Sequence, residues 1–249
     1  MFKIRNKLLQ LPQITWFVTK LMAAPVAEKV FSLSRREEAV RDYVLEHATV
    51  DDSAAVLAAM DEFASNKRWL MNIGPKKGEI LVGAISSLKK THDIRMLEIG
   101  AYCGYSAVLA GEQLKKRGGT LVSIEKSRRC SDVARQIIAH AGLSQTVTVH
   151  KGILEQFVDQ LEQPFDIVLL DHWKDLYLPD LQLLEQAGLL QVGSVVVADN
   201  IEFFDVADYL DYVRDGGFFE STFHESSVEY NDNIKDGVEV SVLTRAQPA

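Results

Sequence analysis

The chain has 249 residues, 47% of them hydrophobic, which is enough for the core of a single α/β domain. Its formal net charge of -8 argues against a broad nucleic-acid surface, because phosphate binding needs clustered lysine and arginine. The two cysteines, Cys103 and Cys130, form neither a C-x-x-C motif nor a zinc-type spacing with histidine, so they favour a reducing, cytoplasmic compartment.

Residues 1–27 differ in charge from the rest of the chain, because they carry four basic residues and no acidic one. Their uncharged run is too short to cross a bilayer, which needs about 20 apolar residues. We predict an amphipathic extension that either makes weak contact with a membrane surface or packs as a helix on the acidic body of the protein. A cleaved targeting sequence is a third reading, which Lys20 weakens. Residues 28–249 are predicted to form one domain.

Three helices are predicted before the first strand. Ser34 and Glu37 form a capping box, and apolar residues follow at helical spacing. A second helix is expected after Asp52. The pattern then breaks at Gly74 and Pro75, where a third helix begins.

The pattern changes after Arg95 to short apolar runs that alternate with helical segments. The runs predicted as buried strands are residues 95–101, 120–125, 146–152, 165–171 and 194–200. The helices predicted between and after them are residues 105–116, 127–142, 154–161, 177–188 and 205–214. This alternation of strands and helices predicts a doubly wound, mostly parallel sheet. Two last strand-like runs, 218–226 and 237–245, predict an antiparallel edge hairpin, which makes seven strands.

The turn after the first predicted strand, "EIGAYCGYS", indicates the class of cofactor. A dinucleotide site expects G-x-G-x-x-G, whereas three residues separate Gly100 from Gly104 here. This spacing disfavours NAD and suits a cationic cofactor without a pyrophosphate, such as S-adenosylmethionine. Glu98 is placed to assist its ammonium end, and Glu125, at the end of the next strand, to accept both ribose hydroxyls. The alternative is a tight packing turn that binds nothing.

Asp171, Asp199 and Asn200 follow the fourth and fifth predicted strands. Adjacent strands lie about 4.8 Å apart, so these side chains can share one cation if the two strands are neighbours. Oxygen ligands of this kind suit Mg²⁺, with water and two adjacent substrate hydroxyls completing its coordination shell. The alternative is that each acid caps the helix that follows it.

Lys174 lies three residues after Asp171 and would serve as a general base. A free phenol has a pKa near 10, and coordination to a metal lowers it. A cation beside a lysine favours its neutral form, so the amine can take the phenol proton. The phenolate would then attack the cofactor methyl in line. In the simpler reading, Lys174 is a solvated lysine paired with Asp175.

Five segments, "LEIGAYCGYSAV", "LLDHWKDLYLPD", "ADN", "WLMNIG" and "VEY", resemble animal-type catechol O-methyltransferases, and the similarity runs from about Arg41 to the last strand. The resemblance implies a class I methyltransferase fold, S-adenosylmethionine and Mg²⁺, with Lys174 as general base. The implied metal ligands are Asp171, Asp199 and Asn200. The implied substrate residues are Trp69, Met71, Asn200, Phe204 and Glu229, of which Glu229 would hold the second catechol hydroxyl. The implied cofactor contacts are Ile73, Glu98, Gly100, Tyr102, Ser106, Glu125, Glu155, Asp171, His172 and Trp173.

The chain departs from this family at three places in the implied site, and one of them is the loop after Glu229, which is one residue longer than usual. Leu154 and Glu155 stand where the family usually has Ser-Gln near the adenine, and Glu155 is expected to accept a bond from the exocyclic amine. Phe204 replaces a proline in the substrate wall, so the preferred substrate size can differ.

The leading interpretation is Mg²⁺-dependent methyl transfer to one hydroxyl of a small catechol. The nearest alternative substrate is another vicinal-hydroxyl phenol, such as a caffeoyl-type ester or a flavonoid. An NAD-dependent oxidoreductase and a cofactor-binding protein without turnover are alternatives from other classes. The sequence does not determine the natural catechol, the hydroxyl that is methylated or the oligomeric state.

Overall fold

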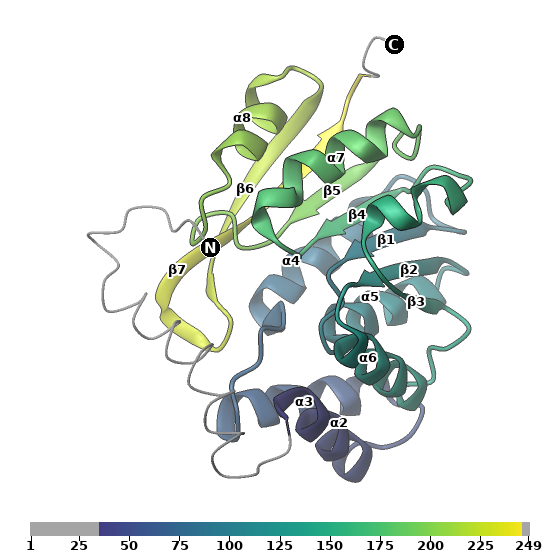
Figure 1. The fold of residues 1–249 in the computed structure, drawn as a ribbon, viewed down its shortest axis with the longest axis vertical. Helices are drawn as coiled ribbons and strands as arrows, with labels where there is room; N and C mark the ends of the chain where they lie inside the picture. The colour runs from purple at the N-terminus through teal and green to yellow at the C-terminus, as the bar shows by residue number, and fades with distance from the viewer. Residues whose placement is uncertain (1–34, 246–249) are drawn as a thin grey trace.

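The structure, a computed structural model, describes residues 35–245. Within this range seven strands form one sheet in the order β3-β2-β1-β4-β5-β7-β6 (Figure 1). Strands β1 to β5 are parallel, whereas β7 is antiparallel to both β5 and β6. The predicted fold class, a doubly wound sheet with an antiparallel edge hairpin and extra N-terminal helices, is therefore confirmed.

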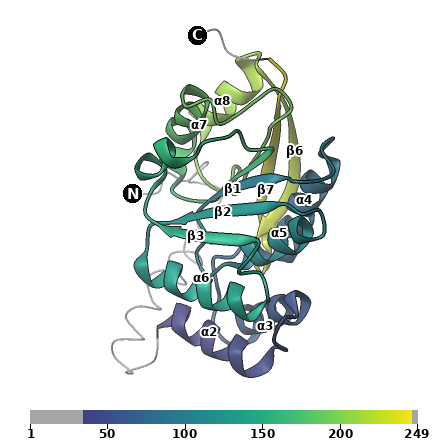
Figure 2. The same ribbon diagram turned by 90° about the vertical axis from the view of Figure 1, so that its right-hand side faces the viewer.

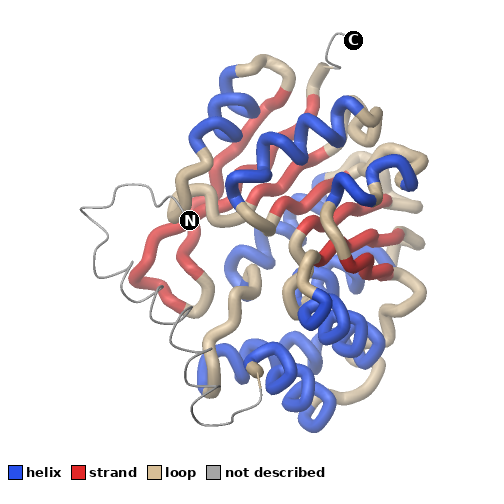
Figure 3. Tube along the Cα trace, viewed as in Figure 1, coloured by secondary structure: helices blue, strands red, loops and turns tan. Residues whose placement is uncertain are grey.

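The helices and strands alternate along the chain from β1 to β6, as Figure 3 shows. The strands are β1 (Arg95–Ile99), β2 (Thr120–Glu125), β3 (Val147–Lys151), β4 (Ile167–Leu170), β5 (Val195–Ala198), β6 (Phe219–Val228) and β7 (Asn231–Leu243). The α-helices are α2 (Arg36–His47), α3 (Ser53–Asn66), α4 (Gly74–Ser87), α5 (Tyr105–Lys115), α6 (Arg128–His140), α7 (Tyr177–Gln186) and α8 (Ala207–Asp215). The described part of the chain also contains three 3-10 turns, η1 (Leu154–Gln156), η2 (Val158–Gln160) and η3 (Lys174–Leu176).

The sheet is buried on both faces, which explains why its central strands read as continuous apolar runs. Successive side chains of a strand point to opposite faces, so Met96 packs in one core and Leu97 in the other. Helices α4 and α5 cover the first face, and α7 and α8 cover the second (Figure 2). Among residues 35–245 there is no helix long and apolar enough to cross a membrane.

Residues 154–161 were predicted as one helix, and the structure shows a shorter and tighter helical form there. They form the two turns η1 and η2, whose backbone bonds join residues three apart, such as Phe157 N to Leu154 O at 2.9 Å. Eight residues are too few to stabilise a helix by themselves, so tertiary packing decides their conformation. The turns bury Leu154 and Val158 under the sheet.

Two sequence predictions fall on residues that the structure does not describe. The basic extension, residues 1–27, lies wholly outside the described range, so its contact with a membrane or with the protein surface stays a prediction. Ser34 of the predicted capping box also lies outside it, and the described helix α2 begins at Arg36.

Candidate functional site

A cavity of about 500 Å³ opens at the carboxyl ends of the parallel strands. This is where ligands bind in open α/β sheets. Thirteen of the predicted site residues line the cavity: Trp69, Met71, Gly100, Tyr102, Glu125, Glu155, Asp171, His172, Trp173, Lys174, Asn200, Phe204 and Glu229. Four others are buried and do not line it: Ile73, Glu98, Ser106 and Asp199.

The turn after β1 forms one wall of the cavity and depends on glycine. Gly100 has a φ of 105°, and a Cβ at this position would overlap the backbone carbonyl of Asp171. Gly104, with a φ of 89°, caps the N-terminus of α5. The backbone of the β1 turn thus passes so close to the end of β4 that a side chain on Gly100 has no space.

Glu125, the last residue of β2, is held by this turn. Its Oε2 accepts a hydrogen bond from Tyr102 N at 2.9 Å, and its Oε1 accepts one from Ser127 N at 2.6 Å. Burial raises the pKa of this carboxyl. A carboxylate offers about four acceptor positions, so two backbone bonds fix its orientation and leave capacity for a ligand.

Glu98, the fourth of the five residues of β1, was predicted to assist the cofactor, but it does not line the cavity. It is fully buried and accepts a hydrogen bond from Ser123 Oγ. Burial raises the pKa of this carboxyl to about 7. Its role toward a cofactor stays a prediction.

The loop after β4 carries four successive site residues with different surroundings. His172 Nε2 lies 2.9 Å from Asp180 Oδ2, and burial lowers the pKa of the imidazole. Trp173 is 51% exposed at the cavity rim, which is unusual for a side chain of this size. Asp171 and Lys174 face the interior, where Lys174 is 9% exposed.

Lys174 is held by two acceptors. Its Nζ donates to Tyr177 Oη at 2.6 Å and lies 3.4 Å from Asp171 Oδ1. The Tyr177 hydroxyl in turn donates to the backbone carbonyl of Asp199 at 3.0 Å. Tyr177, which we had not predicted as a site residue, therefore joins the candidate base to the end of β5.

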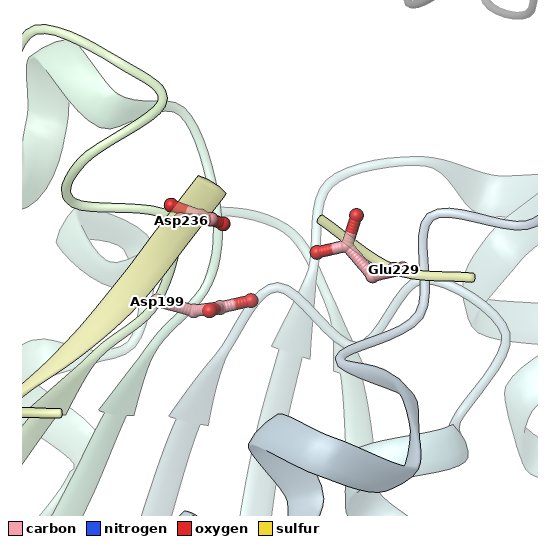
Figure 4. A group of neighbouring side chains, drawn as sticks. All are labelled: Asp199, Glu229 and Asp236. Atoms are coloured by element: carbon pink, nitrogen blue, oxygen red, sulfur yellow. The ribbon is translucent and has the colours of Figure 1, made fainter. Parts of the chain in front are cut away.

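A buried cluster of charged groups lies next to Lys174, and the sequence did not predict two of its members. Lys77 Nζ lies 2.8 Å from Asp199 Oδ1, 2.5 Å from Glu229 Oε1 and 3.1 Å from Asp236 Oδ2. Oxygen atoms of the three acids lie within 4.8 Å of one another, and Figure 4 shows the carboxylates facing a common space. We call Asp199, Glu229 and Asp236 the acidic triad.

The sequence contains a pattern that indicates a buried position for Lys77 and another that does so for Asp236. Asp236 alternates with Ile234 and Val238 along β7, so a charged residue stands at a position that faces the core. Lys77 lies one helical turn before the buried Leu81 of α4. A charge on the buried face of an element requires a partner, and the sequence alone does not say where that partner lies.

Asn200 is oriented by the triad. Its Nδ2 donates to Glu229 Oε1 at 2.9 Å and to Asp236 Oδ2 at 2.7 Å. Because carboxylates only accept hydrogen bonds, the amide nitrogen must face them, and Oδ1 points the other way. The residue has a φ of 56°, a left-handed conformation that asparagine tolerates better than most residues.

Asp171 and Asp199 follow neighbouring strands, as predicted, because β4 and β5 pair along their full length. Burial raises the pKa of Asp171 well above its usual value, and the Asp199 charge raises it further. Burial likewise raises the pKa of Asp199, to about 6. With all six groups ionised, the four carboxylates (Asp171 and the triad) exceed the two ammonium groups (Lys77 and Lys174) by two negative charges. These are conditions in which a cation is bound favourably.

Solved structures of O-methyltransferases share this fold. A putative O-methyltransferase from Klebsiella pneumoniae superposes with a TM-score of 0.63 at 18% identity, covering 91% of this chain and all of that one. The O-methyltransferase from Bacillus cereus, in complex with SAH, superposes with a TM-score of 0.62 at 19% identity, covering 89% and 97% of the two chains.

Sequence comparison gives the family. A family model described as "Methyltransferase domain" matches residues 97–201. Catechol O-methyltransferase B of Danio rerio is 39% identical over 84% of this chain and 80% of its own length, and catechol O-methyltransferase of Bos taurus is 38% identical over 83% and 76%. Transmembrane O-methyltransferase of Homo sapiens is 34% identical over 86% and 74%. The resemblance in the sequence motifs is thereby confirmed, and the chain is a methyltransferase that belongs to the catechol O-methyltransferase family.

Proposed function

We propose that this enzyme transfers a methyl group from S-adenosylmethionine to one hydroxyl of a catechol, with Mg²⁺ as cofactor and Lys174 as general base. Family membership supports the reaction. The observation that carries the metal and the base is the pair of excess negative charges beside Lys174 at the cavity wall.

The cavity suits S-adenosylmethionine, which supplies a methyl group on a positively charged sulfur when it is bound. Glu125 lines the cavity at the end of β2 and would accept the ribose hydroxyls. Gly100 lets the backbone of its turn approach a ligand closely. The exposed indole of Trp173 at the rim offers an apolar surface for the adenine.

The donor set beside Lys174 suits Mg²⁺, which lowers the pKa of a coordinated phenol when it is bound. Asp171, Asp199 and the Oδ1 atom of Asn200 would hold the ion, because Mg²⁺ prefers oxygen ligands. The fit rests on charge as well as on atom type, since one divalent ion balances the two excess negative charges.

In its neutral form, which a cation bound beside it would favour, Lys174 would take the proton of the attacking hydroxyl at its Nζ atom. Tyr177 and Asp171 hold this amine in place, so it needs little reorganisation when the substrate arrives. Glu229 would accept a hydrogen bond from the second hydroxyl and so orient the ring. Its carboxylate is already fixed by Lys77 and Asn200.

An aromatic wall would select a flat substrate. Trp69, Phe203 and Phe204 belong to one buried cluster and line the cavity. Trp69 Nε1 donates to the backbone carbonyl of Glu229 at 2.9 Å, so the wall is joined to the backbone of the residue that carries the candidate substrate carboxylate. This arrangement favours a small ring with two adjacent hydroxyls.

The test is transfer of a labelled methyl group from S-adenosylmethionine to catechol, with phenol as the matched substrate that lacks the second hydroxyl. We expect methylation of catechol, little of phenol, loss of activity in EDTA and recovery with Mg²⁺. Activity that persists in EDTA would remove the metal from the mechanism. Methylation of a caffeoyl-type ester without methylation of catechol would assign a larger substrate.

A further inference from the structure

Lys77 is a lysine without access to solvent. Its side chain is 1% exposed and reaches from the first turns of α4 into the acidic triad. The side chain is therefore a buried cation with three buried anionic partners.

The geometry matches an ammonium group in detail. A lysine amine has three N–H donors, and the triad has three carboxylates within its reach, at 2.8, 2.5 and 3.1 Å. Asp236 is fully buried, and its other oxygen accepts the Phe203 N–H at 3.1 Å. Each acid of the triad is thus held from one side by the same nitrogen atom.

Three carboxylates whose oxygens lie within 4.8 Å of one another would otherwise be a suitable site for a divalent ion. Without a cation at its centre, the triad would have to spread apart or take up protons, because like charges at this distance repel strongly. Either change would move Asp199 and release the two acceptors that orient Asn200, namely Glu229 and Asp236.

We propose that Lys77 is a positioning residue whose ammonium group acts as a permanent cation in the triad of Asp199, Glu229 and Asp236. It holds Asp199 and Glu229 in their working positions. It also keeps a metal ion out of the triad, so that a single divalent ion binds, on the Asp171 side. The part of the inference that concerns a metal ion on the Asp171 side rests on the proposed function. The role of Lys77 in the triad follows from the contacts described above.

The experiment replaces Lys77 with methionine, which keeps the length of the side chain and removes its charge. The matched control is Lys76→Met on the same helix, because Lys76 pairs with Asp232 at 2.6 Å on the surface, where both side chains are mostly exposed. Mn²⁺ binding is measured by equilibrium titration without substrate, and kcat and KM for catechol are measured separately with S-adenosylmethionine.

We expect the wild type and Lys76→Met to bind one Mn²⁺ per chain, and Lys77→Met to bind two, because the triad then lacks its cation. We expect the KM for catechol to rise about tenfold or more in Lys77→Met, the usual size of effects from residues that orient metal ligands. One Mn²⁺ per chain with an unchanged KM in Lys77→Met would overturn the inference.

If Lys77→Met does not fold, the double variant Lys77→Met/Asp236→Asn removes one positive and one negative charge. We expect it to fold, to bind one Mn²⁺ and to show a raised KM for catechol; a wild-type KM would overturn the positioning role. If the wild type binds no Mn²⁺, the metal ion of the proposed function is refuted. If Lys77→Met binds one Mn²⁺ in that case, the result still supports the role of Lys77.

Discussion

The two halves of the cavity are built in different ways. The half formed by β1 and β2 is shaped by its backbone: Gly100 permits a close chain crossing, and Glu125 is held by two backbone N–H groups. The half formed by β4, β5 and β7 is shaped by buried charges, in which Lys77 and Lys174 hold four carboxylates. The first half depends on the absence of a side chain at its close chain crossing, and the second depends on the balance of its buried charges. Different substitutions should therefore disrupt the two halves.

Loss of the candidate base should produce the largest effect on activity, and this effect should be confined to the half of the cavity shaped by buried charges. Lys174→Met is expected to lower kcat by about 10²- to 10⁴-fold, the usual contribution of a general base, and to leave the affinity for S-adenosylmethionine unchanged. Steady-state kinetics and calorimetry measure the two quantities. The control is Lys151→Met at the exposed end of β3, which should behave as the wild type. Unchanged turnover in Lys174→Met would remove this residue from the mechanism.

The backbone half should be most sensitive at Gly100. Gly100→Ala combines a positive φ with overlap against the Asp171 carbonyl and should lower the free energy of unfolding by about 2–5 kcal/mol. Gly188 has a φ of 68° and open space around it, so Gly188→Ala should cost only about 1–2 kcal/mol. Urea denaturation compares the two variants. Equal losses would show that the chain crossing at Gly100 is not tight.

Glu98 is the buried acid of the backbone half, and its effect should depend on pH. Its pKa is raised to about 7 in the folded protein, so between pH 4.5 and 7 the native carboxyl keeps a proton that the unfolded chain releases. The free energy of unfolding should therefore fall through this window, by about 3 kcal/mol in all.

The variant Glu98→Gln cannot titrate and should lack this contribution. Urea denaturation of both proteins from pH 4 to 8 should give curves that diverge as the pH rises, with the variant gaining relative to the wild type. Curves that stay parallel would show that the carboxyl ionises in the folded protein as readily as in the unfolded chain.

The smallest effect is expected at Tyr177, which joins Lys174 to the end of β5. Tyr177→Phe removes one hydroxyl and should lower kcat about tenfold while the free energy of unfolding falls by about 1 kcal/mol. Tyr212→Phe is the control, because Tyr212 donates to Glu185 at 2.7 Å away from the site. It should lose similar stability and keep its kcat. Equal kcat values in both variants would contradict a positioning role for Tyr177.

The contrast between the halves also explains what the sequence could predict. Gly100, Glu125, Asp171 and Asp199 lie in or directly after strands, so the βαβ pattern and the rule for open sheets place them at one edge. The order of the strands then brings β4 beside β5. These features depend on local patterns and a common topology.

The rest of the site depends on contacts between distant segments. Lys77 and Asp236 are separated by 159 positions and meet only because α4 packs beside β7. No spacing or periodicity encodes that meeting. The sequence could not distinguish one helix from two 3-10 turns at residues 154–161 for a related reason, since a segment of that length takes the conformation that its surroundings impose.

The central claim is that the excess charge beside Lys174 binds one divalent ion through Asp171. Calorimetric titration of Mg²⁺ into the wild type and into Asp171→Asn tests it most directly. The account predicts one ion per wild-type chain and an affinity about 10- to 100-fold lower in the variant. Equal affinities in the two proteins, or no binding to the wild type, would contradict it.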